Sequence, residues 1–328
     1  MSNPQLLLPL EYVQKATEHI NRAKKHVSFL CMMVTDDTAT DELIDALAAA
    51  AKRGVNVQVA ADTFTYGELG GHFIPLKYYT KKTRTVTKMS RELIQAGVRF
   101  TWLGRFSTLP FTGRTHSKCL VIDNTVYSFG GVNLYDESLG YVDYMFEYED
   151  PLLALELRDE IARLVKADGS NFAYRSHEFS IGKLGKVLVD GGFQGDSLIY
   201  RRALQLTREA EEVLFVSQYC PAGRLNRALK NTKSKLYFNK PGNATFWNKI
   251  IIRANMTFSG QKTRYKRKTY LHAKFMIFTM KNGDKIAITG SHNFVPGGVI
   301  FGTRELALET TDKKVIRQLE SFFKEHIV

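Results

Sequence analysis

The sequence predicts an α/β protein of two tandem halves, each βαβ-rich with a mixed sheet flanked by helices, packed together as a pseudo-twofold body. Three observations predict this class: apolar segments with strand and helix spacing alternate, a short polar motif occurs once in each half, and the composition is that of a globular protein. The chain has 328 residues, of which 44% are hydrophobic. A chain of this size and composition buries a substantial core.

The first half predicts a βαβ unit. Residues 26–34 (HVSFLCMMV) form a short apolar run that is typical of a strand. Residues 40–54 follow with apolar side chains at helical spacing, and Gly54 is a typical helix stop. Residues 55–62 (VNVQVAAD) predict the next strand.

The second half predicts the same alternation. Residues 203–221 read as a helix followed by a strand, residues 223–231 as a second helix, and residues 248–258 (NKIIIRANMTF) as a second strand. We therefore expect a duplicated unit. The expected boundaries are a first half at 1–165, a linker at 166–185 and a second half at 186–328.

The shared motif combines a histidine, a lysine and an asparagine. It consists of His116, Lys118, Gly130, Gly131 and Asn133 in the first half, and of His272, Lys274, Gly290, Ser291 and Asn293 in the second. Residues i and i+2 of a strand point to the same face, about 6.6 Å apart. Lysine supplies charge for phosphate oxygens, asparagine supplies neutral donors, and histidine acts as a nucleophile or a general acid. The two motifs are expected to converge on one anion.

The charge distribution favours a polyanionic partner. The formal net charge is +13, and such a field attracts nucleic acid or an anionic membrane surface. Basic residues cluster at 77–91 and 262–268. The second cluster ends just before His272, so its side chains are expected at the mouth of the site and to bind substrate. These are Arg264, Lys266, Arg267 and Lys268, with Lys262 beside them.

At these motifs the sequence resembles the phospholipase D superfamily, whose signature is H-x-K-x4-D followed by G-[SG]-x-N, usually present twice. The first copy is complete, with Asp123 seven positions after His116. In the second copy Thr279 occupies the aspartate position. Asp284 either replaces the missing carboxylate or is only a turn residue, and the second interpretation is favoured. The resemblance implies that the aspartate mainly supports structure. It also implies that Gly131 and Ser291 belong to the substrate-binding part of the motif.

The resemblance implies a reaction in two displacement steps through a phosphohistidine. His116 is expected to be the nucleophile and His272 the general acid and base, with Lys118, Lys274, Asn133 and Asn293 holding the phosphate oxygens. An acid downstream of each motif orients a histidine in the family, and Asp143 and Glu305 are the matching candidates. His292 stands at the variable position of its motif and is expected to have no role.

Three functions remain open. The first is a phosphodiesterase or phosphatidyltransferase that acts on phospholipids, as in bacterial cardiolipin synthases; the second is a nuclease; the third is a non-catalytic binding protein. The apolar segments 66–79 and 294–302 could admit acyl chains or belong to the core. No metal or other cofactor is expected, because no paired cysteines or carboxylate–histidine cluster stand at ligand spacing.

The expected partner is an anionic phospholipid surface, with nucleic acid as the alternative. The expected form is a monomer, since one chain contains both motifs. Cys31, Cys119 and Cys220 are predicted to be buried thiols, and the N-terminal residues lack the pattern of a signal peptide. These features predict a cytoplasmic protein that associates peripherally with the inner face of the membrane.

Overall fold

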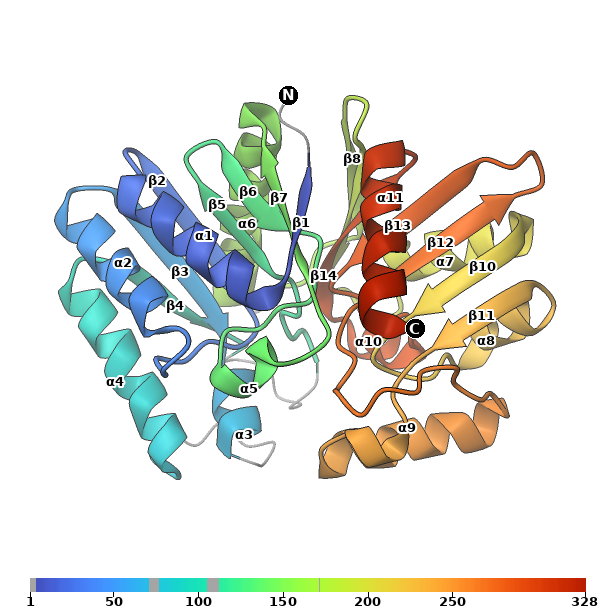
Figure 1. Cartoon of the computed structure of the whole chain (residues 1–328). Helices are drawn as coiled ribbons and strands as arrows, with labels where there is room; N and C mark the ends of the chain where they lie inside the picture. The colour runs from blue at the N-terminus through green and yellow to red at the C-terminus, as the bar shows by residue number, and fades with distance from the viewer. Residues whose placement is uncertain (1–3, 71–76, 105–111, 171) are drawn as a thin grey trace. The chain divides into compact units, whose positions relative to one another are not determined.

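The computed structural model describes residues 4–70, 77–104, 112–170 and 172–328, which form two compact units (Figure 1). The first unit comprises Met1–Ser128, Val132–Gly140 and Met145–Tyr174. The second unit comprises Phe129–Gly131, Tyr141–Tyr144 and Arg175–Val328.

The first unit is built on a seven-stranded mixed sheet with the strand order β1-β7-β6-β5-β2-β3-β4. The pairs β2–β3 and β3–β4 are parallel, and the other neighbours are antiparallel. Its strands are β1 (Gln5–Leu7), β2 (His26–Cys31), β3 (Asn56–Asp62), β4 (Arg99–Leu103), β5 (Cys119–Ile122), β6 (Thr125–Ser128) and β7 (Met145–Glu149). Its helices are α1 (Pro9–Arg22), α2 (Asp41–Lys52), α3 (Phe64–Gly70), α4 (Lys81–Gln95), α5 (Asp136–Leu139) and α6 (Pro151–Gly169).

The second unit has its own seven-stranded mixed sheet, in the order β11-β10-β12-β13-β14-β9-β8. Its strands are β8 (His177–Ile181), β9 (Gly185–Gly191), β10 (Ala210–Val216), β11 (Lys233–Tyr237), β12 (Phe275–Met280), β13 (Lys285–Gly290) and β14 (Arg304–Thr310). Its helices are α7 (Leu198–Glu209), α8 (Gly223–Lys230), α9 (Phe246–Ser259), α10 (Pro296–Phe301) and α11 (Lys313–Phe322), with a 3₁₀ turn at Pro241–Asn243 and a π turn at Phe323–Ile327.

The duplication is visible in the order of six strands. The series β3-β2-β5-β6-β7-β1 in the first unit corresponds to β11-β10-β12-β13-β14-β9 in the second. Strand β4 extends one sheet, and β8 extends the other at the opposite end. The predicted fold class is confirmed: each unit is a mixed sheet flanked by helices.

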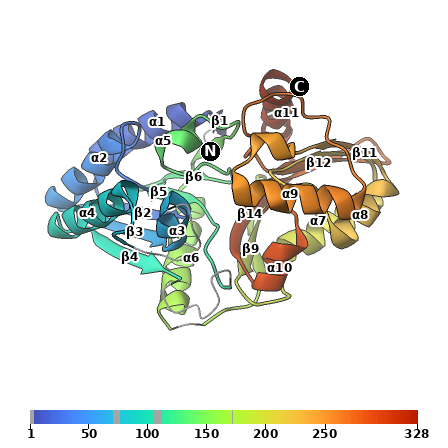
Figure 2. The same ribbon diagram turned by 90° about the horizontal axis from the view of Figure 1, so that it is seen from below.

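Helices cover both faces of each sheet, so each unit has a buried core of its own. In the first unit α1, α2 and α4 lie on one face and α6 on the other, and in the second α7 and α8 lie opposite α11 (Figure 2). The first core includes Val27, Phe29 and Leu120, and the second includes Phe215 and Phe278. The buried faces of the central strands hold the motif-bearing segments in place.

One predicted strand is wrong. Residues 248–258 belong to the helix α9, and the strand that follows α8 is β11, with the sequence KSKLY. The run Ile250–Ile252 suggested a strand because β-branched residues favour strands. The sequence did not predict β11, because this short strand contains two lysines and lacks a run of apolar residues. Lysines are common in edge strands, and β11 lies at the edge of its sheet.

The structure also differs from the expected halves. The segment 166–185 contains the end of α6 and the whole of β8, which pairs with β9. In addition, Phe129–Gly131 and Tyr141–Tyr144 come from the first half of the sequence but belong to the second unit. The units are therefore not two consecutive pieces of chain.

Candidate active site

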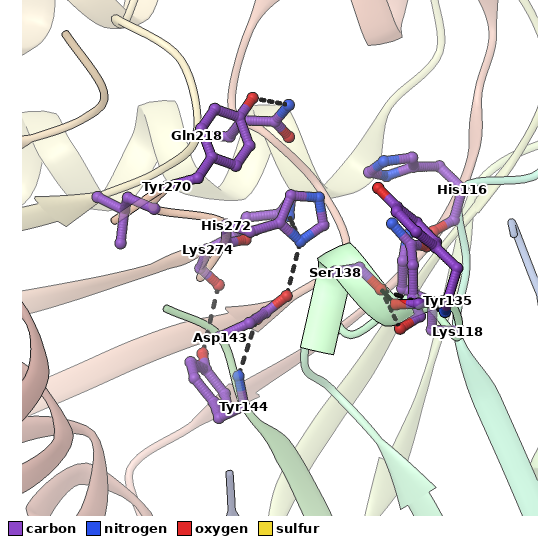
Figure 3. Close-up of polar contacts among 12 residues, drawn as sticks. His116, Lys118, Tyr135, Ser138, Asp143, Tyr144, Gln218, Tyr270, His272 and Lys274 are labelled. Atoms are coloured by element: carbon purple, nitrogen blue, oxygen red, sulfur yellow. Dashed lines mark hydrogen bonds and ion pairs between the residues drawn. The ribbon is translucent and has the colours of Figure 1, made fainter. Parts of the chain in front are cut away.

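In the first unit, His116 and Lys118 lie immediately before β5, in an extended segment rather than within the predicted strand. Lys118 is buried, and its Nζ donates a hydrogen bond to the carbonyl of His116 at 2.7 Å. The carbonyl of Lys118 in turn accepts from the hydroxyl of Ser128 at 3.1 Å. Figure 3 shows both motif side chains. These contacts hold the lysine beside the histidine backbone.

Asp62, at the end of β3, fixes the segment that leads into His116. Its carboxylate accepts from the backbone of Thr115 at 2.8 Å and forms a buried ion pair with Arg114 at 3.0 Å. Burial raises the pKa of Asp62, and the charge of Arg114 and the backbone hydrogen bonds of Thr115 and Phe64 oppose that rise. Sequence reasoning missed this pair, because nothing in the sequence links residues 52 positions apart.

Asp123 has a structural role, as the family pattern implied. Its carboxylate accepts backbone hydrogen bonds from Lys24, Lys25 and His26, each at 2.9 Å. Partial burial alone would raise the pKa of Asp123, but these hydrogen bonds hold it below its usual value. Asp123 therefore ties the β5–β6 turn to the start of β2.

The second unit repeats the lysine contact and adds a buried carboxylate. The Nζ of Lys274 donates to the carbonyl of His272 and lies 3.2 Å from His272 Nδ1. The Oδ2 of Asp143 lies 2.6 Å from the same Nδ1 (Figure 3). All three side chains are buried, and Lys274 is fully inaccessible. Burial strengthens the electrostatic coupling between these groups.

The carboxylate determines which nitrogen of His272 reacts. Burial would raise the pKa of Asp143, but the charge of His272, its hydrogen bond and the charge of Lys274 hold that pKa below its usual value. An ionised carboxylate only accepts hydrogen bonds, so Nδ1 carries a proton. The neutral imidazole then has its lone pair on Nε2, which is the nitrogen that can accept a proton or act as a nucleophile.

Asp143 reaches His272 because two segments from the first half of the sequence are part of the second unit. The carbonyl of Val142 accepts from the backbone of His272 and Ala273, each at 2.9 Å. The backbone N–H of Gly131 donates to the carbonyl of Tyr144 at 3.2 Å. A Cβ on Gly131 would lie 2.7 Å from the Asp143 carboxylate, so only glycine fits there. This gives Gly131 a packing role.

Two tyrosines near His272 were not anticipated. The ring of Tyr270 lies 6.4 Å from the imidazole in a stacked arrangement, and the ring of Tyr141 lies at 6.0 Å. The hydroxyl of Tyr270 accepts from Gln218 Nε2 at 2.9 Å. Tyr270 stands two residues before His272, and in an extended segment that spacing was a signal that could have been used.

The second-half acid, Glu305, is buried and accepts a hydrogen bond from the hydroxyl of Ser291. The backbone N–H and C=O of Leu306 bond the same serine, so Ser291 links its motif to β14. His292 is also buried, and its Nδ1 accepts from the backbone of Phe294 at 2.8 Å. The structure thus gives His292 a packing role that the sequence did not predict.

The two motif asparagines carry buried amide oxygens without a partner in the described structure, namely Oδ1 of Asn133 and of Asn293. An unsatisfied buried polar atom is costly. Rotating an amide by 180° exchanges oxygen and nitrogen, so each side chain can offer either an acceptor or a donor. Both asparagines are therefore suited to a polar ligand.

Asp284 is a turn residue, as interpreted from the sequence. Its backbone and side chain bond the side chain of Asn282 in the exposed β12–β13 turn. Thr279, at the aspartate position, lies within β12 opposite Lys285. The second hairpin is thus closed without a carboxylate like that of Asp123.

The basic cluster 262–268 divides into two kinds of residue. Lys262, Arg264, Lys266 and Lys268 are exposed. Arg267 is exposed too, but it also donates to the backbone carbonyls of Glu325 and Val328, at 2.7 and 3.0 Å, and so holds the C-terminal turn. Of the apolar segments proposed to admit acyl chains, 66–79 lies partly outside the described residues. The other segment is mixed, with Phe294 buried and Ile300 exposed.

The three cysteines are buried free thiols, as predicted. Burial raises the pKa of Cys119 to about 12 and that of Cys220 to about 11, although hydrogen bonds with Ser128 and Ser259 oppose the rise. They are poorly suited to nucleophilic chemistry.

The two regions that contain the motifs are similar to known proteins. Residues 16–165 and 222–327 match the family described as "Cardiolipin synthase, PLD-like domain". The Major cardiolipin synthase ClsA of Bacillus subtilis (strain 168) is 31% identical over 131 residues, which are 39% of this chain and 24% of that relative. The chain therefore matches about a quarter of the relative's length.

Solved structures share the fold at low identity. A phosphatidylserine synthase from Haemophilus influenzae Rd KW20 has a TM-score of 0.72 and 14% identity, covering 99% of this chain and 86% of that one. A polyphosphate kinase from Porphyromonas gingivalis has a TM-score of 0.62 and 12% identity, covering 97% of this chain and 49% of that one. Because the family match extends over more than half of the chain and includes both H-x-K motifs, the chain belongs to the phospholipase D superfamily, in its cardiolipin synthase-like family.

Proposed function

We propose that this protein is a metal-independent phosphodiesterase or phosphatidyltransferase of the phospholipase D type that acts on phospholipids. The observation that carries the proposal is the buried pair of Asp143 and His272, 2.6 Å apart, with Lys274 beside it. An imidazole oriented by a carboxylate and adjacent to a lysine is suited to proton transfer at a phosphate ester. His116 and Lys118 supply a second imidazole and a second lysine, and Lys118 donates to the carbonyl of His116.

The proposed reaction has two displacements. In the first, an imidazole nitrogen of His116 attacks phosphorus, the bond to the leaving alcohol breaks, and His272 in its imidazolium form protonates the leaving oxygen from Nε2. In the second, His272 removes a proton from water or an incoming alcohol, whose oxygen attacks phosphorus and releases His116. Each step conserves protons, so one imidazole serves as both acid and base.

The lysines and asparagines of the motifs are assigned to the phosphate oxygens. Lys118 and Lys274 supply fixed positive charge, and their contacts to the histidine carbonyls limit their motion. Asn133 and Asn293 supply amide groups whose buried oxygens have no partner in the described structure. Such preorganised groups stabilise the negative charge on the phosphoryl oxygens in the transition state.

We propose that the reaction needs no metal, because each motif places a lysine beside its histidine and cationic neighbours disfavour the binding of a divalent cation. Within the described ranges, no group of three or more His, Cys, Asp or Glu side chains has a metal-binding arrangement. The charge that a metal would supply is provided here by Lys118 and Lys274.

The family match and the cardiolipin synthase relative support a phospholipid substrate. The net charge of +13 favours an anionic lipid surface. We propose that the protein works as a cytoplasmic monomer, peripherally bound at the inner face of the membrane, because a single chain contains both motifs.

The test is turnover of defined phospholipids by purified protein. We expect head-group release or phosphatidyl transfer, abolished by His116→Ala and by His272→Ala, while His326→Ala, a histidine outside both motifs, retains activity. In His272→Asn the second step slows, so an acid-labile phosphorus adduct should accumulate on His116. An adduct on His272 instead would exchange the two roles.

The same protein should be incubated with single- and double-stranded DNA and RNA. Cleavage of oligonucleotides that His116→Ala abolishes, with no turnover of any phospholipid, would replace the lipid assignment by a nuclease. Binding of DNA without cleavage would reflect the positive field alone. No turnover of either class would favour a non-catalytic binding protein.

A further inference from the structure

Helix α9 has an unusual distribution of side chains. Its outer face exposes large apolar residues, with exposed fractions of 68% for Phe246, 48% for Ile250, 44% for Ile251 and 89% for Phe258. Phe246, Ile250 and Phe258 are separated by multiples of four residues, so they lie along one side of the helix. The helix lies at the periphery of the second unit (Figures 1 and 2).

The inner face of α9 is anchored by polar groups. Asn248 accepts from the hydroxyl of Tyr219 at 2.6 Å, and Asn255 donates to the carbonyl of Cys220 at 3.4 Å. Ser259 is buried, and its carbonyl accepts from Asn226 on α8. Ile252 is buried on the same inner face and Met256 packs against the second core, so apolar residues already fill that face. The outer face of a surface helix is normally polar. Core packing therefore does not explain the outer phenylalanines and isoleucines.

Basic residues accompany this apolar face. Lys249 and Arg253 are exposed one turn apart on α9, and the exposed lysines and arginines of 262–268 follow shortly after the helix. Between Glu212 and Asp284 the sequence contains fifteen lysines and arginines and no acidic residue. An apolar helix face beside a strongly basic surface is the pattern of a helix that lies in the interface of an anionic membrane.

We propose that α9 docks the protein onto a bilayer of anionic phospholipid, with Phe246, Ile250, Ile251 and Phe258 inserted below the headgroups and Lys249 and Arg253 on the phosphates. The helix has 14 residues, fewer than the roughly 20 needed to span a bilayer, so it would lie in the plane of the membrane. Among the helices of the described chain, none is both long and apolar enough to cross a membrane.

Other occupants fit less well. A second copy of the chain would bring Lys249 and Arg253 against the same charges of the partner, because a twofold interface pairs identical surfaces. Nucleic acid would match the charge, but its phosphates give the isoleucines no apolar environment. An anionic bilayer satisfies both the charge and the apolar side chains. This inference builds on the proposed function, since it names the surface by which the enzyme reaches its lipid.

The experiment is co-sedimentation with vesicles of phosphatidylcholine alone and of an equal mixture with phosphatidylglycerol. The test variant combines Phe246→Ser, Ile250→Ser and Phe258→Ser, and we expect the full chain to lose at least about 10-fold in affinity for the mixed vesicles. Lys249→Gln with Arg253→Gln should weaken the same binding on the order of 30-fold at low salt. Wild-type protein should bind pure phosphatidylcholine poorly.

The matched control changes two exposed apolar residues on another helix, Leu152→Ser and Leu155→Ser on α6, which are 54% and 45% exposed. Exposed acidic residues, Glu156 and Asp159, stand beside them. The control should bind vesicles like the wild type. As a second readout, Phe258→Cys labelled with an environment-sensitive fluorophore should shift its emission to the blue on mixed vesicles. The native cysteines are buried and are expected to stay unlabelled.

Three further measurements distinguish a loss of membrane docking from a loss of folding or of catalysis. Circular dichroism and thermal unfolding confirm that the variants fold. Turnover of a soluble short-chain phospholipid should be unchanged in the α9 variants. If the wild type binds mixed vesicles but turns over no phospholipid, the proposed function fails and the docking surface stands. The docking proposal is overturned if the wild type does not bind mixed vesicles or if the triple variant binds them like the wild type. It is also overturned if the wild type is a dimer, the triple variant is a monomer, and vesicle binding is the same for both.

Discussion

The carboxylate of Asp143 lies 2.6 Å from Nδ1 of His272, although 129 positions separate the two residues in the sequence. The acid follows the first H-x-K motif, yet it orients the histidine of the second. The contact places the proton of the neutral imidazole on Nδ1, facing the carboxylate. The acid–base role that we propose for His272 would therefore depend on a residue from the first half of the sequence.

Replacing Asp143 by asparagine should impair proton transfer while preserving the shape of the site. We expect turnover of a phospholipid substrate to fall about 10²- to 10⁴-fold, the usual range for a lost general acid or base. Without the carboxylate charge the imidazolium is less stable, so the alkaline limb of the pH–rate profile should move to lower pH. The check is kcat/KM measured between pH 5 and 9.

Asp143→Glu serves as the conservative control and should recover part of the rate, because it restores the charge. An unchanged pH–rate profile in Asp143→Asn would mean that the carboxylate only supports packing.

Breaking the buried ion pair of Asp62 and Arg114 should lower the free energy of unfolding more than breaking a surface pair. Removing either partner breaks a buried ion pair, and we expect Asp62→Ala or Arg114→Ala to lower the free energy of unfolding by about 3–5 kcal/mol. The double variant should lose less than the sum of the two. Urea unfolding of all four proteins measures this coupling.

Lys15 and Glu147 form a more exposed pair in the same unit, so Lys15→Ala is the comparison and should cost about 1 kcal/mol or less. Strict additivity of the Asp62 and Arg114 effects would contradict a direct interaction.

The stability contributed by Asp123 should depend on pH. Because hydrogen bonds lower the pKa of Asp123 in the folded protein, its contribution is fully present above the unfolded value, about 3.9, and is lost as the pH falls through the lower folded value. Asp123→Asn should therefore lower the free energy of unfolding by about 1 kcal/mol at pH 7 and much less at pH 3. Urea unfolding at pH 7, 5 and 3 tests this.

Asp284→Asn, in the corresponding turn of the second unit, should have a small effect at each pH, since the Asp284 carboxylate accepts from the exposed side chain of Asn282 and not from a row of backbone N–H groups in the described structure. An equal loss for Asp123→Asn at pH 3 and pH 7 would show that the carboxylate charge is unimportant.

Chelation should leave the reaction intact. With Lys118 and Lys274 supplying positive charge, we expect phospholipid turnover to persist after dialysis against EDTA. The test is to measure the rate before and after dialysis. The rate is then measured again after Mg²⁺, Ca²⁺, Mn²⁺ or Zn²⁺ is added singly. Complete loss that one of these metals restores would refute a lysine-based site.

The features that could be predicted from the sequence are those encoded locally. Strands β2 and β3 and helices α2 and α8 follow directly from the spacing of apolar residues, and both H-x-K motifs are linear patterns. Helix α9 was mistaken for a strand because the run Ile250–Ile252 outweighed its helical context. Its outward apolar face also removed the amphipathic signal on which helix prediction relies.

The remaining features depend on contacts between residues that are distant in sequence. Asp62 lies 52 positions from Arg114, and Gln218 lies 52 positions from Tyr270. The family pattern proposed Asp143 as an orienting acid but did not identify its histidine. The assignment of Phe129–Gly131 and Tyr141–Tyr144 to the second unit depends on packing around Thr289, whose hydroxyl donates to the carbonyl of Phe129 and contacts Tyr144.

That assignment has a consequence for any attempt to divide the protein. A C-terminal fragment starting at Arg175 would retain His272 and Lys274 but lack Asp143 and the Val142 carbonyl that receives the backbone of His272. A chimaera can also be considered that joins this C-terminal portion to the N-terminal portion of another family member. In it, His272 would face a carboxylate supplied by the other protein in place of Asp143. The repeats have ceased to be interchangeable modules, so changes around Asp143 and around His272 are expected to be selected together.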